Sequence, residues 1–168
     1  LPHMATPETL GIIAGNRDLP VLLAREARAA GVRRLVAVAM KGETDETLAE
    51  HVDEITWVKV GQLNKLIKTF RGADVTQCVM VGQIAPDNLF NLRPDLRAMK
   101  LLVGLKKKNA HTIFGGIAAE LAKDGIELIE ATPWLQSAMP AKGFVLGPQL
   151  TESQQADIEY GLRMATEI

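Results

Sequence analysis

Cysteine is nearly missing from this sequence, and so are the long apolar runs of membrane proteins. The one cysteine, Cys78, cannot form a disulfide within the chain, which suits a reducing compartment. It lies in the apolar run of residues 75–81, so we expect a buried packing thiol. No apolar run approaches the roughly 20 residues that span a bilayer, and the N-terminus lacks the order of a secretory signal. We therefore expect a cytoplasmic protein.

An excess of charge of one sign is missing too. The net charge is −1 over 168 residues, so the chain shows no basic surface of the kind that binds nucleic acid. Several catalytic patterns are also missing: His51 and His111 have no metal-ligand spacing, and neither a Gly-x-Ser-x-Gly elbow nor a Walker loop occurs. Zinc binding and nucleophilic catalysis are therefore not expected from these residues.

What the chain does have is an alternation of strand-like and helix-like segments. Apolar strand-like segments occupy residues 9–14, 35–39, 53–58, 77–81 and 126–131, and amphipathic helical patterns lie between them. Such alternation is typical of a parallel sheet covered by helices. The sequence predicts an α/β fold, a Rossmann-like three-layer unit with a mostly parallel sheet of about five strands.

The two ends of the chain suggest its domain organisation. Residues 1–3 precede Met4 and are interpreted as a cloning remnant, and residues 4–139 form the predicted Rossmann-like domain. Residues 140–168 are predicted to be a linker followed by a helix, which begins with a capping box from Thr151 to Gln154. The apolar stripe of this helix still runs at Ile168, so we expect that a C-terminal domain is absent from this chain.

Two glycine turns follow the first and fourth predicted strands. Gly15, Asn16 and Asp18 come after residues 9–14, and Gly82, Gln83 and Ile84 come after residues 77–81. Because the carboxyl ends of parallel strands meet at one edge of a sheet, we expect the two turns to converge on a ligand there. Their backbone N–H groups, aided by the helix that starts near Pro20, are suited to phosphate groups.

These residues and Arg93 are the predicted substrate-binding residues, and each has a purely structural alternative. The first turn could be only a tight connection, Asp18 is also a natural helix N-cap, and Arg93 could instead pair with Asp95 in its loop. Asp18 and Asp87 could reach a divalent metal, although both are also ordinary turn or cap residues. No metal ligand is assigned from these patterns.

Four segments together resemble a known family. They are residues 11–20 (GIIAGNRDLP), 61–70 (GQLNKLIKTF), 80–84 (MVGQI) and 89–95 (LFNLRPD), and the likeness extends from about Gly11 to the last residue. In order and spacing they resemble the N-terminal domain of the UDP-2,3-diacylglucosamine pyrophosphatase family of lipid A biosynthesis.

The resemblance implies a magnesium-dependent hydrolase that releases UMP and 2,3-diacylglucosamine 1-phosphate at the cytoplasmic side of the inner membrane. It also implies that the catalytic acidic residue belongs to a C-terminal domain, so no catalytic residue is expected in this chain, which alone should be inactive. The expected partners are the UDP-linked glycolipid and the chain's own C-terminal domain, and a second copy is a candidate.

Two departures and two alternatives accompany this resemblance. Family members often have glycine in place of Arg17, and often an acidic pair near residues 109–111, where this sequence has none. An alternative is a non-catalytic nucleotide-binding or regulatory module. A nicotinamide-dependent reductase is disfavoured, because the glycine pattern is incomplete and no acidic residue ends the second strand at residues 39–41.

Overall fold

The computed structural model of this chain describes residues 6–84, 94–105 and 110–166. Its contacts divide the chain into two units, residues 1–138 and residues 139–168, and each unit is described by itself.

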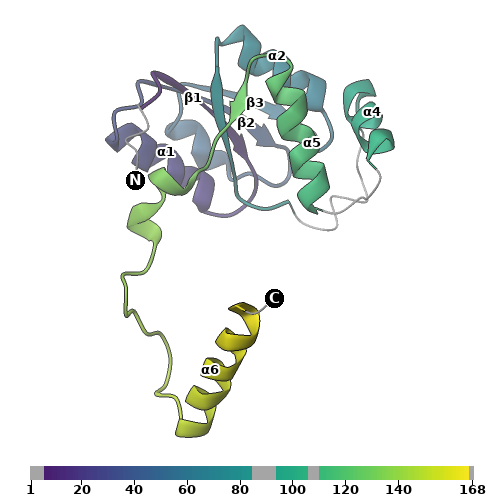
Figure 1. Cartoon of the computed structure of the whole chain (residues 1–168). Coiled ribbons are helices and arrows are strands. Elements are labelled where there is room, and N and C mark those ends of the chain that lie inside the picture. The colour runs from purple at the N-terminus through teal and green to yellow at the C-terminus, as the bar shows by residue number, and fades with distance from the viewer. Residues whose placement is uncertain (1–5, 85–93, 106–109, 167–168) are drawn as a thin grey trace. The chain divides into compact units, whose positions relative to one another are not determined.

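The first unit is built on one parallel sheet (Figure 1). Its strands are β1 (Thr9–Ala14), β2 (Arg34–Met40), β3 (Glu54–Val58), β4 (Gln77–Val81) and β5 (Glu127–Leu128), in the spatial order β3-β2-β1-β4-β5. After β3 the chain crosses to the far side of β1 to form β4, so the order reverses between β1 and β4. Ligands bind at such a reversal in open α/β sheets.

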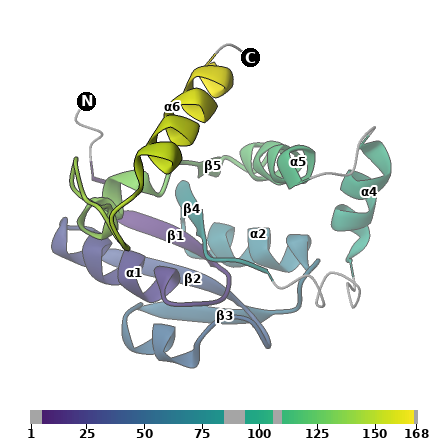
Figure 2. The same ribbon diagram turned by 90° about the horizontal axis from the view of Figure 1, so that it is seen from below.

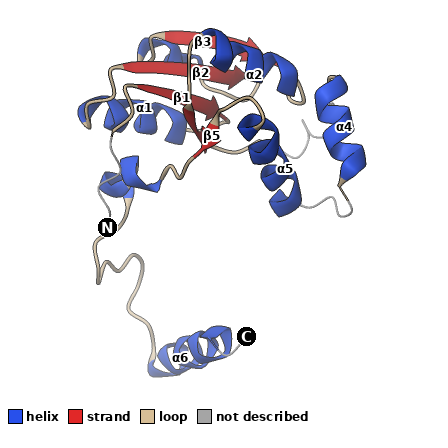
Figure 3. Cartoon of the chain, turned by 45° about the horizontal axis from the view of Figure 1, so that its top comes forward, coloured by secondary structure: helices blue, strands red, loops and turns tan. Residues whose placement is uncertain are grey.

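Helices cover both faces of the sheet (Figures 2 and 3). One core cluster joins α1 (Leu19–Ala29) and the 3₁₀ segments η1 (Glu46–Glu50) and η2 (Thr132–Trp134) to one face. The other cluster joins α2 (Leu63–Gly72), α4 (Leu96–Gly104) and α5 (Ala110–Ala122) to the opposite face. Burial from both sides explains why residues 35–40 of β2 are all buried. The predicted three-layer α/β architecture is confirmed.

The fifth strand is shorter than the sequence predicts. We expected a strand over residues 126–131, whereas β5 has only two residues, paired with Gln77 and Cys78. Ile129 still donates its N–H to the Cys78 carbonyl at 2.8 Å, but Pro133 then sits in the first turn of η2. A proline fixes its φ near the helical value and cannot donate to a ladder, so the strand ends early. A further 3₁₀ turn, η3 (Gln136–Ala138), ends the unit.

The second unit contains the helix α6 (Glu152–Thr166). Its predicted capping box is confirmed: Gln154 donates its N–H to the Thr151 hydroxyl, and the Thr151 N–H donates to the Gln154 side chain at 3.0 Å. All residues from 139 to 166 are exposed, including the apolar side chains of Ile158 and Leu162. Within the described ranges, no helix has both the length and the apolar content needed to cross a membrane.

Candidate functional site

The two glycine loops, residues 15–18 after β1 and residues 82–84 after β4, lie against each other. The Gly15 N–H donates to the Val81 carbonyl at 2.8 Å, and the Asn16 N–H donates to the Gln83 carbonyl at 2.7 Å. Asn16 and Gln83 thereby form an isolated antiparallel bridge. The predicted convergence of the two loops is therefore confirmed, while their role in substrate binding stays a prediction.

Glycine is needed in both loops because their backbones approach too closely for a side chain. A Cβ on Gly15 would lie 2.3 Å from the Gln83 carbonyl oxygen, well inside any real contact. Gly82 has φ +91°, and a Cβ there would lie 2.8 Å from the Asn16 carbonyl oxygen. The two glycines therefore allow the loop backbones to come close enough to hydrogen-bond to each other.

This joining corrects one expectation from the sequence. The N–H groups of Gly15 and Asn16 are donated to carbonyls of β4 and its loop, so they are not available to a phosphate. The start of α1 still offers donors. Leu22 donates its N–H to the Asp18 carbonyl at 3.0 Å, so the amides of Leu19 and Val21, which precede Leu22 in the first turn, have no acceptor within the helix.

A third loop, which follows β2, completes this edge of the sheet. The buried Thr44 hydroxyl donates to the Ala14 carbonyl at 2.7 Å and accepts the Met40 N–H at 2.9 Å, which ties this turn to the end of β1. The turn places Glu43 beside the first glycine loop, where Asn16 donates its side-chain N–H to the Glu43 carboxylate at 3.0 Å.

Sequence reasoning missed Glu43. Residues 39–41 at the end of the second strand include no acidic side chain, whereas the turn that follows brings Glu43, three residues beyond the end of β2, back to the edge. The pair Gly42-Glu43 was the available signal, since Gly42 has φ +79° and marks a tight turn.

The first glycine loop also carries two energetic costs. Among the described residues no group hydrogen-bonds to the Asn16 side-chain carbonyl, although this oxygen is buried. Arg17 has φ +67°, a left-handed conformation in which a residue with a Cβ is strained. Such costs persist where the surrounding structure imposes them, and they cluster at functional sites.

The remaining predicted site residues have mixed outcomes. Asp18 occupies the N-cap position of α1 but makes no side-chain cap hydrogen bond, so its structural alternative is only half correct. Gln83 is exposed and Ile84 is half-buried against the core cluster of α2, α4 and α5. Arg93, and with it Asp87, lies outside the described residues.

Asp95 caps a helix, a role that our sequence analysis did not assign to it. Its carboxylate accepts the N–H groups of Arg97 and Ala98 and caps α4, and it accepts the Asn64 N–H of α2 at 2.6 Å. These bonds give Asp95 a structural role whether or not Arg93 pairs with it.

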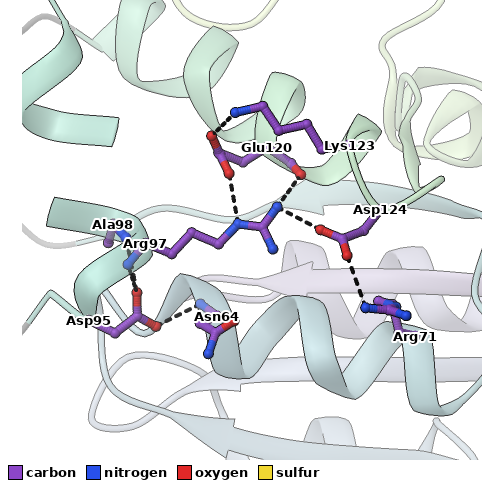
Figure 4. Close-up of polar contacts among 8 residues, drawn as sticks. All are labelled: Asn64, Arg71, Asp95, Arg97, Ala98, Glu120, Lys123 and Asp124. Carbon is purple, nitrogen blue, oxygen red and sulfur yellow. Dashed lines mark hydrogen bonds and ion pairs between the residues drawn. The ribbon is translucent and has the colours of Figure 1, made fainter. Parts of the chain in front are cut away.

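Beyond this cap, a charged cluster joins α4 to α5 (Figure 4). Arg97 binds the Glu120 carboxylate at 2.7 Å and the Asp124 carboxylate at 2.6 Å, and Asp124 also pairs with Arg71. Hydrogen bonds from Lys123 and Arg97 hold the pKa of Glu120 below its ordinary value. All of these charges have partners, which indicates a structural role.

Two hollows among the described residues lie away from the candidate edge: one is lined by residues around Thr9 and Gln77, at the amino ends of β1 and β4, and the other by residues of α2 and α4. No group of three or more histidine, cysteine or acidic side chains gathers anywhere in the described ranges. The described part of the candidate edge presents polar side chains, among them the exposed Gln83.

The fold and the joined glycine loops lie in the segment that a known family model matches. The model of the LpxI N-terminal domain matches residues 9–138. The chain belongs to this family. The predicted resemblance is confirmed, and it covers the whole sheet and both layers of helices.

A curated relative and a solved structure are also similar to this chain. UDP-2,3-diacylglucosamine pyrophosphatase LpxI of Caulobacter vibrioides is 26% identical over 162 residues, which is 95% of this chain. The chain spans 57% of the length of that relative. A solved structure titled as the crystal structure of gox2253 is similar to 74% of this chain and 34% of its own chain, with a TM-score of 0.46 and 14% identity.

Proposed function

We propose that this LpxI-family chain is the N-terminal substrate-binding part of a hydrolase in lipid A biosynthesis. The complete enzyme would cleave the pyrophosphate of UDP-2,3-diacylglucosamine to 2,3-diacylglucosamine 1-phosphate and UMP. The family match over residues 9–138 supports the class of enzyme, and the name of the Caulobacter relative supports the substrate.

The observation that carries the binding role is the meeting of the loops after β1 and β4 at the point where the strand order reverses. In the proposal, the UDP phosphates lie at the start of α1, whose first-turn amides and helix dipole favour anions. Gln83 is exposed and provides a neutral hydrogen-bonding side chain next to this site. Asn16 can contribute only through its side-chain NH₂ group, because its side-chain carbonyl is buried and the NH₂ group also donates to Glu43.

The chemical step is proposed for the complete enzyme. We propose that it depends on magnesium, that it takes place at the cytoplasmic side of the inner membrane, and that its catalytic acid lies in a further domain. The part of this chain that the structure describes gathers no set of three histidine, cysteine or acidic side chains, so the magnesium ligands are proposed to belong to the further domain.

A non-catalytic nucleotide-binding or regulatory module remains the second candidate. The whole candidate edge lies within the first unit, so a ligand could bind there without any further domain. Turnover distinguishes the two candidates. A full-length protein that releases UMP from UDP-2,3-diacylglucosamine is the hydrolase, and one that binds nucleotide without turnover is the module.

Calorimetric titration of the chain with UDP, UMP, ATP and NADH tests the binding role. We expect UDP and UMP to bind more tightly than ATP or NADH, and Gln83→Ala to weaken UDP binding by about fivefold, or roughly 1 kcal/mol. Gln136→Ala is the matched control, since this exposed glutamine lies in η3, and it should bind UDP as the unaltered chain does. Absence of uridine nucleotide binding would overturn the proposal.

A further inference from the structure

We propose that the outward face of α4 is a membrane-contact surface, on which Leu96, Met99 and Val103 enter the interface of an anionic bilayer. Lys100 on the same face, together with the lysines of α2, then contacts the anionic headgroups. This inference rests on the proposed function only in taking the substrate to be a membrane lipid, and membrane binding itself can be measured without any substrate.

The outward face of α4 is apolar although it is exposed. Leu96 is 79% exposed, Val103 is 80% exposed and Met99 is 49% exposed. By helical periodicity these three residues and Lys100 lie on one side of the helix, while Ala98 is buried on the other. A helix that packs on a core with one side normally presents polar residues on its other side, so packing within this unit does not explain the apolar outward face.

The neighbouring helix α5 also exposes a large apolar side chain. Figures 1 and 2 show α4 beside α5 at the end of their helical layer. Leu101, on the inward side of α4, packs closely on α5, since a Cβ on Gly116 would lie 3.2 Å from its side chain. Phe114 of α5 is 51% exposed. The inward side of α4 thus anchors this helix to the first unit, and the outward side remains exposed.

The exposed charges of this helical layer are basic. α2 buries its apolar side chains and exposes Lys65 and Lys68, and α4 exposes Lys100. Neither α2 nor α4 contains an acidic residue, and Glu120 of α5 and Asp124 beyond it are held in ion pairs. Lysines next to exposed leucine, methionine and valine are typical of helices that lie in the interface of an anionic membrane.

The position of α4 suits a substrate that is held in a membrane. The Asp95 N–H at the start of α4 donates to the Gly61 carbonyl at 3.1 Å, so α4 begins beside the loop that follows β3. That loop lies at the carboxyl edge of the parallel sheet, which also carries the two glycine loops. Ile84 of the second glycine loop packs against the same core cluster as α4. A glycolipid whose head group reaches this edge can therefore keep its acyl chains in a bilayer that α4 contacts.

A second copy of the chain is the other occupant that an apolar face suggests. The charges favour lipid, because an interface between two copies of this face would bring like charges together, whereas anionic headgroups neutralise them. The contact lies along the membrane surface, since α4 has 9 residues and is too short to cross a bilayer.

Vesicle flotation tests the apolar part of the surface. The 168-residue chain is mixed with vesicles of phosphatidylcholine alone or of phosphatidylcholine and phosphatidylglycerol. We expect it to bind the anionic vesicles, and the double variant Leu96→Gln, Val103→Gln to bind them at least about tenfold more weakly, because two apolar side chains no longer leave water. The matched control is Val145→Gln, Leu146→Gln in the second unit, where the same chemical change falls on side chains that are 79% and 88% exposed. This control should bind as the unaltered chain does.

A charge variant tests the basic part. Lys100→Gln should weaken binding to the anionic vesicles by about fivefold and reduce its dependence on salt, because one lysine no longer contacts the headgroups. Lys142→Gln changes the net charge equally at an exposed position of the second unit and should have no such effect.

The inference is overturned if the unaltered chain binds neither kind of vesicle or binds both equally. It is also overturned if the control at Val145 and Leu146 loses binding while the variant at Leu96 and Val103 keeps it. Sedimentation equilibrium identifies the other occupant: a dimer that the α4 variant abolishes, with vesicle binding unchanged, would assign this face to a second copy.

Titration of the same proteins with UDP separates this inference from the proposed function. A chain that binds UDP but no vesicles retains the proposed function and loses the membrane-contact surface. A chain that binds anionic vesicles through α4 but no UDP retains the surface and loses the proposed function. Unfolding midpoints of all variants confirm that they fold.

Discussion

Gly15 is the residue on which the candidate site most depends. A Cβ at this position would lie 2.3 Å from the carbonyl oxygen and 2.7 Å from the nitrogen of Gln83, so the two loops would have to separate. We expect Gly15→Ala to destabilise the chain by about 3 kcal/mol in urea unfolding, as overpacking against a backbone does. It should also weaken UDP binding.

Gly72→Ala is the matched control for this change. A Cβ on Gly72, the last residue of α2, meets nothing within 4 Å. Because alanine favours helix more than glycine does, we expect stability to stay equal or rise by up to about 1 kcal/mol. If both alanine variants unfold at the same urea concentration, the close approach of the Gln83 backbone to Gly15 does not affect the free energy of unfolding, which would contradict this prediction.

Arg17 allows a test of strain in the same loop. Its φ of +67° is unfavourable for any residue with a Cβ. We expect Arg17→Gly to be more stable than Arg17→Ala by about 1 kcal/mol, because only glycine removes the strain. Urea unfolding of both variants measures this difference. A variant with glycine no more stable than the one with alanine would show that the loop carries no strain.

At the residue scale, the sequence predicts the position of a site residue that directly follows a strand, but not that of a residue placed by the geometry of a turn. The meeting of Gly15 and Gly82 could be predicted, because each directly follows a buried strand. Glu43 could not, since its position depends on a turn tied to β1 through the buried Thr44 hydroxyl. That bond joins residues 30 apart in the sequence, and no local pattern contains it.

At the element scale, the sequence predicts the order of strands and helices, and it predicts their ends less well. The amphipathic pattern of Leu63, Leu66, Ile67 and Phe70 identifies α2, and all four side chains are buried as expected. The early end of β5 was missed, because an apolar run does not show how many of its residues find a partner strand. The cap of Asp95 on α4 had a readable signal in its position just before the helical pattern.

The docking of α4 on α5 should depend on pH through Glu120. Because the folded-state pKa of Glu120 lies below the 4.5 of an unperturbed glutamate, its charged form favours folding above that pH. This contribution is lost as pH falls below 4.5 and through the folded-state pKa. We expect Glu120→Gln to be less stable than the unaltered chain by about 1 kcal/mol at pH 7, and the difference to shrink at low pH.

Urea unfolding between pH 3 and pH 7 measures this change. Glu50→Gln, at an exposed position, is the control and should follow the unaltered chain throughout. A difference for Glu120→Gln that stays constant over this range would show that packing of the side chain, and not its charge, joins the two helices.

At the scale of the whole molecule, alternation of elements is enough to predict a parallel sheet with helices on both faces. The Rossmann-like expectation also implied that β1 and β4 are neighbours, and the strand order agrees. The division of the chain into two units is harder to predict from the sequence. The apolar stripe of α6 indicates that one side of this helix packs against something, but it does not identify the partner. In the structure its apolar residues are exposed.

The stability of the first unit should not depend on the second. Both core clusters consist of residues before position 136, so the first unit has a complete core of its own. We therefore expect a protein of residues 1–138 to unfold cooperatively within about 1 kcal/mol of the whole chain, and to bind UMP equally well. Differential scanning calorimetry and UMP titration measure the two properties.

A protein of residues 1–131 is the informative comparison, because it lacks Trp134, which is 7% exposed in the core cluster against α1. Removing a buried aromatic side chain typically costs about 3–5 kcal/mol, so this shorter protein should be far less stable than residues 1–138. If residues 1–138 instead fail to fold, the second unit is part of the folding unit of this chain. The boundary near residue 138 would then separate two groups of contacts that nevertheless unfold together.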